Sequence, residues 1–120
     1  MKTQSSLNFE SAPKIKQLLH AAEIQLEKVF KEKLKKIILF GSYSRGDYDK
    51  ESDVDVMVLV DNCDPRAYDD IILDMEVDLS ITFDIVLTMF VESEAEYEKA
   101  RRYKPYINEI DREGIEIYAT

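Results

Sequence analysis

The sequence predicts an α/β (α+β) domain in which a small mixed β-sheet is flanked by helices. Two observations support this fold class. Segments with apolar residues three or four positions apart, the spacing of one helical face, alternate along the chain with short apolar runs suited to strands. The 120 residues also show no repeat, low-complexity segment or linker. We therefore expect a single domain over residues 1–120.

The first half of the chain predicts one long helix and two strands. The helix begins at Ser11 with Pro13 in its first turn. Its apolar stripe comprises Ile15, Leu18, Leu19, Ala22, Leu26, Val29 and Phe30. The apolar run 37–40 predicts a buried strand, and the β-branched run 53–60 predicts a second. The segment between these strands is polar and rich in turn-forming residues, and a short helix is expected at its start.

The middle of the chain predicts a second amphipathic helix followed by a third strand. Asp64 and Pro65 mark the start of the helix. Its apolar positions are Tyr68, Ile71, Ile72, Met75 and Leu79. Alternation of apolar and polar residues over 80–87 then predicts a strand that carries Asp84.

The last third predicts two helices and a closing strand. Ser93 and Glu96 have the spacing of a capping box for a helix that continues to about Arg102. A further segment begins at Pro105 and is ended by Gly114, and the apolar residues of 115–118 suggest a short last strand.

Charge and composition exclude several classes of protein. The net charge of −9 and the pI of about 4.6 have the wrong sign for a protein that holds nucleic acid through its phosphates. A bound metal or a basic protein partner fits this charge better. Cys63 is the only cysteine, so no internal disulfide can form. No apolar run approaches the roughly 20 residues needed to span a bilayer, and the first ten residues lack the apolar core of a signal peptide. We expect a cytoplasmic protein without a membrane partner.

Two acids on the second predicted strand are candidate metal ligands. Asp53 and Asp55 are two positions apart, so their side chains leave the same face of the strand, while Val54 and Val56 occupy the other face. Two close carboxylates repel each other unless water, a proton or a cation intervenes. A hard divalent cation such as Mg²⁺, which prefers oxygen ligands and substrate phosphates, is the simplest compensation.

Further residues would complete such a site. Asp84 supplies a third acid on a neighbouring predicted strand, and three acids could hold two Mg²⁺ ions roughly 3.5–4 Å apart. Gly41 and Ser42 lie where a strand ends and a short helix starts, so backbone amides and a hydroxyl can meet phosphate oxygens there. Arg45, within the same loop, is a candidate phosphate contact. No Gly-Lys-Ser/Thr follows, so this is not a P-loop.

The motif formed by these residues resembles that of the minimal nucleotidyltransferase (MNT) domain of the DNA polymerase beta superfamily. It consists of Gly41 and Ser42, the ten residues from Tyr43 to Ser52, and then Asp53-x-Asp55. The resemblance extends over nearly the whole chain, because the leading helix, Asp84 and the closing Arg-Glu-Gly-Ile of residues 112–115 are also similar. It implies a nucleotidyltransferase fold and transfer of AMP from ATP to a hydroxyl. Ser42 would contact the distal phosphates, Asp53 and Asp55 would hold magnesium, and Asp84 would ligate the catalytic metal.

The resemblance also implies an acceptor. Single-domain members of this family are similar to antitoxins encoded beside a helical HEPN ribonuclease toxin, which they silence by placing AMP on a tyrosine. A partner that brings the acceptor would suit a chain too small for a second domain. Two alternatives stay open: an antitoxin that neutralises its partner by binding alone, and a nucleotidyltransferase that acts on a small molecule such as an aminoglycoside.

Overall fold

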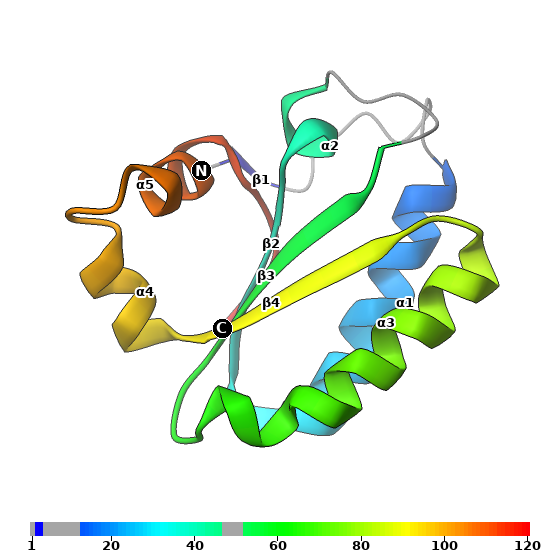
Figure 1. The fold of residues 1–120 in the computed structure, drawn as a ribbon, viewed down its shortest axis with the longest axis horizontal. Helices are drawn as coiled ribbons and strands as arrows, with labels where there is room; N and C mark the ends of the chain where they lie inside the picture. Colours follow the sequence, from blue (N-terminus) through cyan, green and yellow to red (C-terminus); the bar gives the residue numbers. More distant parts are fainter. Residues whose placement is uncertain (1, 4–12, 47–51) are drawn as a thin grey trace.

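The computed structural model describes residues 2–3, 13–46 and 52–120, and it confirms the predicted α/β class. A five-stranded mixed sheet has the order β1-β5-β2-β3-β4 (Figure 1). Its strands are β1 (Lys2–Thr3), β2 (Leu34–Phe40), β3 (Val54–Val60), β4 (Leu87–Ser93) and β5 (Ile115–Ala119). The sequence did not predict the short β1.

Strand pairing brings the end of β2 beside the start of β3. The two strands are antiparallel, and Phe40 pairs with Asp55. β4 runs parallel to β3 on its other side, where Thr88 pairs with Asp55. β5 is antiparallel to β2 and parallel to β1. The loop that leaves β2 and the acids at the start of β3 therefore share one edge of the sheet.

Helices cover both faces of the sheet (Figure 1). One face is covered by α1 (Pro13–Phe30) and α3 (Asp69–Phe83), and the other by α4 (Glu94–Ala100) and α5 (Pro105–Glu113). The one-turn helix α2 (Ser42–Arg45) follows directly on β2, and two short 3-10 helices, η2 (Lys31–Lys33) and η3 (Pro65–Tyr68), precede β2 and α3. None of the helices in the described ranges is long and apolar enough to cross a membrane.

The two faces of the sheet carry separate cores. Val54, Val56 and Val58 are fully buried with the apolar stripe of α1 in the larger core, as their alternation predicted. Met57 and Leu59 face the other way and join Tyr97 and Ile110 beneath α4 and α5. Because side chains alternate along a strand, Asp53 and Asp55 belong to this second face. The predicted start of α1 at Ser11 lies outside the described residues.

The predicted strand over 80–87 is wrong. α3 continues to Phe83, Asp84 follows it in the left-handed conformation (φ 54°), and β4 begins only at Leu87. Ser80 stabilises this turn, since its carbonyl accepts from the Ile85 amide at 3.2 Å and its hydroxyl from the Leu87 amide at 2.9 Å. The alternation of apolar residues over 80–87 fits a strand, but its first part also fits the last turn of a helix. The hydrogen bonds to Ser80 favour the helix and the turn that follows it.

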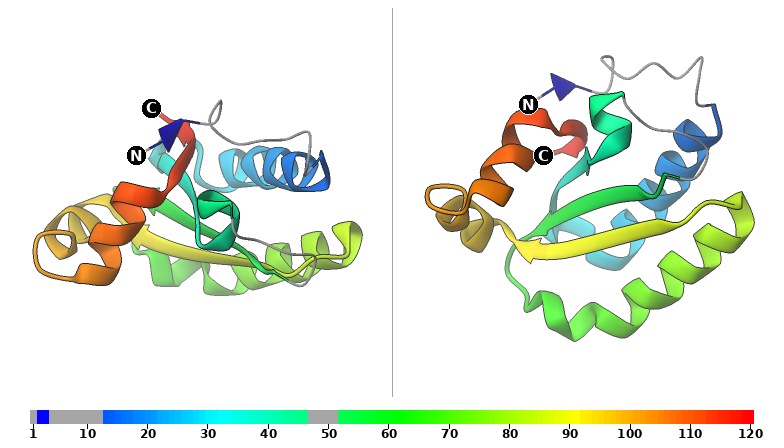
Figure 2. Two further views of the ribbon diagram at one scale, coloured as in Figure 1. Left: turned by 90° about the horizontal axis from the view of Figure 1, so that it is seen from above. Right: turned by 45° about the horizontal axis from the view of Figure 1, so that its top comes forward.

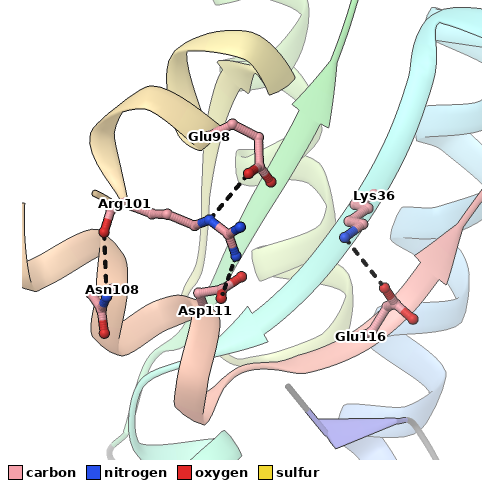
Figure 3. A network of polar contacts seen from close by, with 6 residues as sticks. All are labelled: Lys36, Glu98, Arg101, Asn108, Asp111 and Glu116. Atoms are coloured by element: carbon pink, nitrogen blue, oxygen red, sulfur yellow. Dashed lines mark hydrogen bonds and ion pairs between the residues drawn. The ribbon is translucent and has the colours of Figure 1, made fainter. Parts of the chain in front are cut away.

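A polar network joins α4 to α5 (Figure 3). The Arg101 guanidinium contacts Glu98 at 3.1 Å and Asp111 at 3.0 Å, and the Asn108 side chain donates to the Arg101 carbonyl at 3.3 Å. α4 itself begins with the predicted cap, because the Ser93 hydroxyl accepts from the Glu96 amide at 3.0 Å. These contacts connect α4 to α5 at the surface of the molecule.

Candidate active site

An open cleft of about 460 Å³ lies where β2, α2, β3, β4 and α5 meet. Figure 2 shows α2 at the end of β2, near the start of β3. The residues that line the cleft are Phe40, Gly41, Ser42, Arg45, Asp53, Asp55, Phe90, Tyr106, Glu109, Ile110 and Glu113. Five predicted site residues are therefore brought together in one cavity, whose size is ordinary for a small-molecule ligand.

Gly41 and Asp55 are in close contact at the base of the cleft. Gly41 has φ +81°, a conformation that favours glycine, and a Cβ placed there would lie 2.8 Å from Oδ2 of Asp55. The phosphate-loop candidate and the acid-pair candidate are thus parts of the same site. The absence of a side chain at Gly41 is what lets the loop approach the carboxylate.

The acid pair is electrostatically strained. Burial raises the pKa of Asp55, the neighbouring Asp53 carboxylate raises it further, and Arg45 opposes the shift. Asp55 is half-buried and Asp53 is exposed. A cation placed between the two carboxylates would offset this repulsion.

The donor set suits magnesium held jointly by protein and substrate. Mg²⁺ usually binds through one or two carboxylates, substrate phosphates and water. Asp53 and Asp55, which both line the cleft, would supply the carboxylates. Among the residues that the structure describes, no three His, Cys, Asp or Glu side chains are placed to share a metal ion.

α2 presents the polar groups of the loop. The Gly41 carbonyl accepts from the Ser44 and Arg45 amides and from the Ser44 hydroxyl at 2.9–3.2 Å, which closes a tight turn. Ser42 and Arg45 line the cleft from this turn. Residues 47–51, part of the spacer in the family motif, lie outside the described residues.

Asp84 is not among the described residues that line the cleft. It follows α3 rather than lying on a strand, and the residue of β4 that pairs with Asp55 is the neutral Thr88. The expectation that strand geometry would bring Asp84 beside the acid pair is not met. Its role as a third metal ligand stays a prediction.

One wall of the cleft was not predicted from the sequence. Tyr106, Glu109, Ile110 and Glu113 all line it from α5. Their spacing of three and four residues was the available signal, because it places them on one face of a helix. Two aromatic contacts complete the wall: the ring centroid of Phe40 lies 5.8 Å from that of Phe90 and 6.4 Å from that of Tyr106.

Known proteins resemble this chain in sequence. The model of the nucleotidyltransferase domain family matches residues 23–116. Two curated proteins of Methanocaldococcus jannaschii are similar in sequence. "Putative protein adenylyltransferase MJ0141" is 36% identical over 89 residues, which cover 74% of this chain and 84% of the relative. "Putative protein adenylyltransferase MJ0604" is 34% identical over 112 residues, which cover 93% of this chain and 100% of the relative.

A solved structure has a similar fold. One chain of a toxin-antitoxin crystal structure with AMP-PNP superposes with a TM-score of 0.53 at 25% identity, covering 81% of this chain and 70% of that chain. The family model covers most of the sequence and includes Gly41, Ser42, Asp53 and Asp55. The chain therefore belongs to the nucleotidyltransferase domain family.

Proposed function

We propose that the protein uses Mg-ATP to transfer AMP to a tyrosine hydroxyl of a HEPN-type toxin encoded nearby, and that it acts as the antitoxin of this partner. The observation that carries the proposal is the contact between Gly41 and Asp55, which joins a phosphate-binding turn to an acid pair in one cleft. Two relatives are named as protein adenylyltransferases, and a similar structure contains a toxin-antitoxin pair with AMP-PNP.

The residues of the cleft have separate roles in this reaction. Ser42 and Arg45 bind the distal phosphates, and the exposed ring of Tyr106 offers a surface for the base. Magnesium held by Asp53 and Asp55 would neutralise the charge of the triphosphate. The tyrosine oxygen attacks the α-phosphorus, the bond to the β-phosphate oxygen breaks, pyrophosphate leaves and the hydroxyl proton is released. Orientation and charge neutralisation supply most of the catalysis.

A transfer assay with the product of the neighbouring gene tests the proposal. Purified protein with Mg-ATP should add the mass of AMP to one tyrosine of that product, and Asp53→Asn with Asp55→Asn should abolish the addition. A matched control is Asp61→Asn with Asp69→Asn, which removes the same charge away from the cleft and should leave transfer intact. Transfer that persists in the Asp53/Asp55 variant would contradict the assignment of the acid pair.

Survival of cells that express the toxin separates catalysis from simple binding. The Asp53/Asp55 double variant should fail to protect them, although it still folds. Full protection by this variant would favour neutralisation by binding alone. Transfer of AMP to an aminoglycoside in place of the protein would favour the small-molecule alternative.

A further inference from the structure

The outer side of α3 carries an exposed apolar stripe. Leu73, Val77 and Ile81 are 58%, 50% and 76% exposed, although the opposite side of the helix is buried against α1 and the sheet. Their spacing of four residues places them in one row along the helix. Contiguous exposed apolar residues on a small domain commonly mark an interaction site.

An acidic row runs beside this stripe. Asp70, Asp74 and Asp78 are also four residues apart, and they are exposed. Each acid lies three residues before a member of the apolar stripe, as 70 does before 73, 74 before 77 and 78 before 81, so the two rows are adjacent on the helix surface. Together they form a surface on which apolar contact and negative charge are combined.

A groove of about 400 Å³ continues the surface on the other side of the acidic row. It lies between α1 and α3, and its apolar lining includes Val29, Ile71 and Met75. Asp74 and Asp78 line the same groove and outnumber its one lining cation among the described residues, Lys28 of α1. The acids therefore stand between two apolar strips. Figure 1 shows α1 and α3 side by side on the face of the sheet opposite to α4 and α5, and the candidate active site is on the α5 side.

We propose that this α1–α3 surface docks an amphipathic helix of a protein partner, one that carries a row of Lys or Arg beside its apolar row. The charge of the surface selects this occupant. An anionic membrane would be repelled by the acids, and a second copy of this chain, with net charge −9, would bring two acidic rows together. Docking here goes beyond the proposed reaction, because it needs neither nucleotide nor the acid pair and leaves the cleft open.

A synthetic peptide tests the proposal directly. The probe is a fluorescent Leu/Lys helix of about 18 residues, or five turns, with Leu in one row and Lys beside it. Its anisotropy should rise with wild-type protein, and a scrambled peptide of the same composition should bind at least about tenfold more weakly. Asp53→Asn with Asp55→Asn should bind it as the wild type does, so failure of the catalytic proposal would not affect this result.

Two pairs of substitutions locate the binding surface. Val77→Glu with Ile81→Glu, and separately Asp74→Lys with Asp78→Lys, should each weaken peptide binding at least about tenfold. The control is Tyr103→Glu, which changes a 66% exposed aromatic residue elsewhere and should have no effect. Circular dichroism checks the fold, and Ile81→Ser, at the most exposed position, replaces any variant that does not fold.

Four outcomes would overturn the inference. Equal binding of the ordered and scrambled peptides, or of the wild type and both surface variants, would show that the surface is not a docking site for such a helix. Wild-type dimers in sedimentation that Val77→Glu with Ile81→Glu dissolves would identify a second copy as the occupant. Binding to phosphatidylserine vesicles that the same variant loses would identify lipid.

Discussion

At the scale of a single residue, Gly41 has two separate reasons to lack a side chain. Its φ of +81° disfavours any residue with a Cβ, and that Cβ would lie 2.8 Å from Asp55 Oδ2. We expect Gly41→Ala to lower the free energy of unfolding by about 2 kcal/mol and to reduce AMP transfer at least about tenfold, because the Asp55 carboxylate must move. Urea denaturation and the transfer assay measure the two effects.

Gly46→Ala is the matched control for this prediction. Gly46 has a similar φ of +84°, but a Cβ there would meet no atom of the described residues within 4 Å. It should cost only the conformational penalty, about 1 kcal/mol, and keep most of the activity. Equal losses of activity in the two variants would contradict the close approach of Gly41 to Asp55 as the reason for the effect.

At the scale of elements, the sequence predicted well those whose signal was local. The stripe of α1, the buried run of β2 and the alternation of β3 each determine an element, and the acid pair follows from the alternation along β3. The boundary between α3 and β4 could not be predicted this way, because Ile81 and Phe83 fit both a helix and a strand. Hydrogen bonds from residues 85 and 87 back to Ser80 decide it.

Only part of the cleft could be predicted, because the rest depends on contacts between segments far apart in the sequence. Motif spacing placed Gly41, Ser42, Arg45, Asp53 and Asp55 together, since β2 and β3 are joined by the loop that carries them. The wall formed by Tyr106, Glu109 and Glu113 depends on how α5 packs on the sheet, and Phe90 depends on the position of β4. The spacing of the α5 residues shows that they share one helix face, but no local pattern shows that this face meets the cleft.

The junction between α5 and β5 holds this wall in place and gives a second prediction. A Cβ on Gly114 would lie 2.5 Å from Cγ2 of the buried Ile38 and 2.6 Å from the Ile110 carbonyl oxygen. We expect Gly114→Ala to lower the free energy of unfolding by about 1–3 kcal/mol and to weaken nucleotide binding, because α5 must shift. Urea denaturation and titration with a fluorescent ATP analogue measure this. A Gly114→Ala protein as stable as the wild type would contradict the close packing of Gly114 against Ile38 and Ile110.

At the scale of the whole molecule, stability should respond to pH through the active site. Burial and Asp53 raise the folded-state pKa of Asp55, so the folded protein holds this proton more tightly than the unfolded chain does. Ionised Asp55 therefore costs stability above its raised pKa, and the cost disappears as the pH falls below the ordinary carboxyl range near about 4. Arg45 lowers the pKa of Asp55 and so offsets part of this cost.

Asp55→Asn should therefore stabilise the protein in EDTA at pH 7 while it abolishes AMP transfer. The gain should appear as a higher Tm, limited by the partial exposure of Asp55 to solvent, and it should vanish as the pH falls below the ordinary carboxyl range near about 4. Asp61→Asn is the control, because Asp61 pairs with Lys35 at 3.8 Å and its loss should leave stability unchanged or slightly lower. Thermal unfolding across this pH range measures both variants. An Asp55→Asn protein less stable than the wild type at pH 7 would contradict this prediction. It would mean that the ionised Asp55 carboxylate stabilises the fold, and that its repulsion with Asp53 does not destabilise the protein in the absence of a cation.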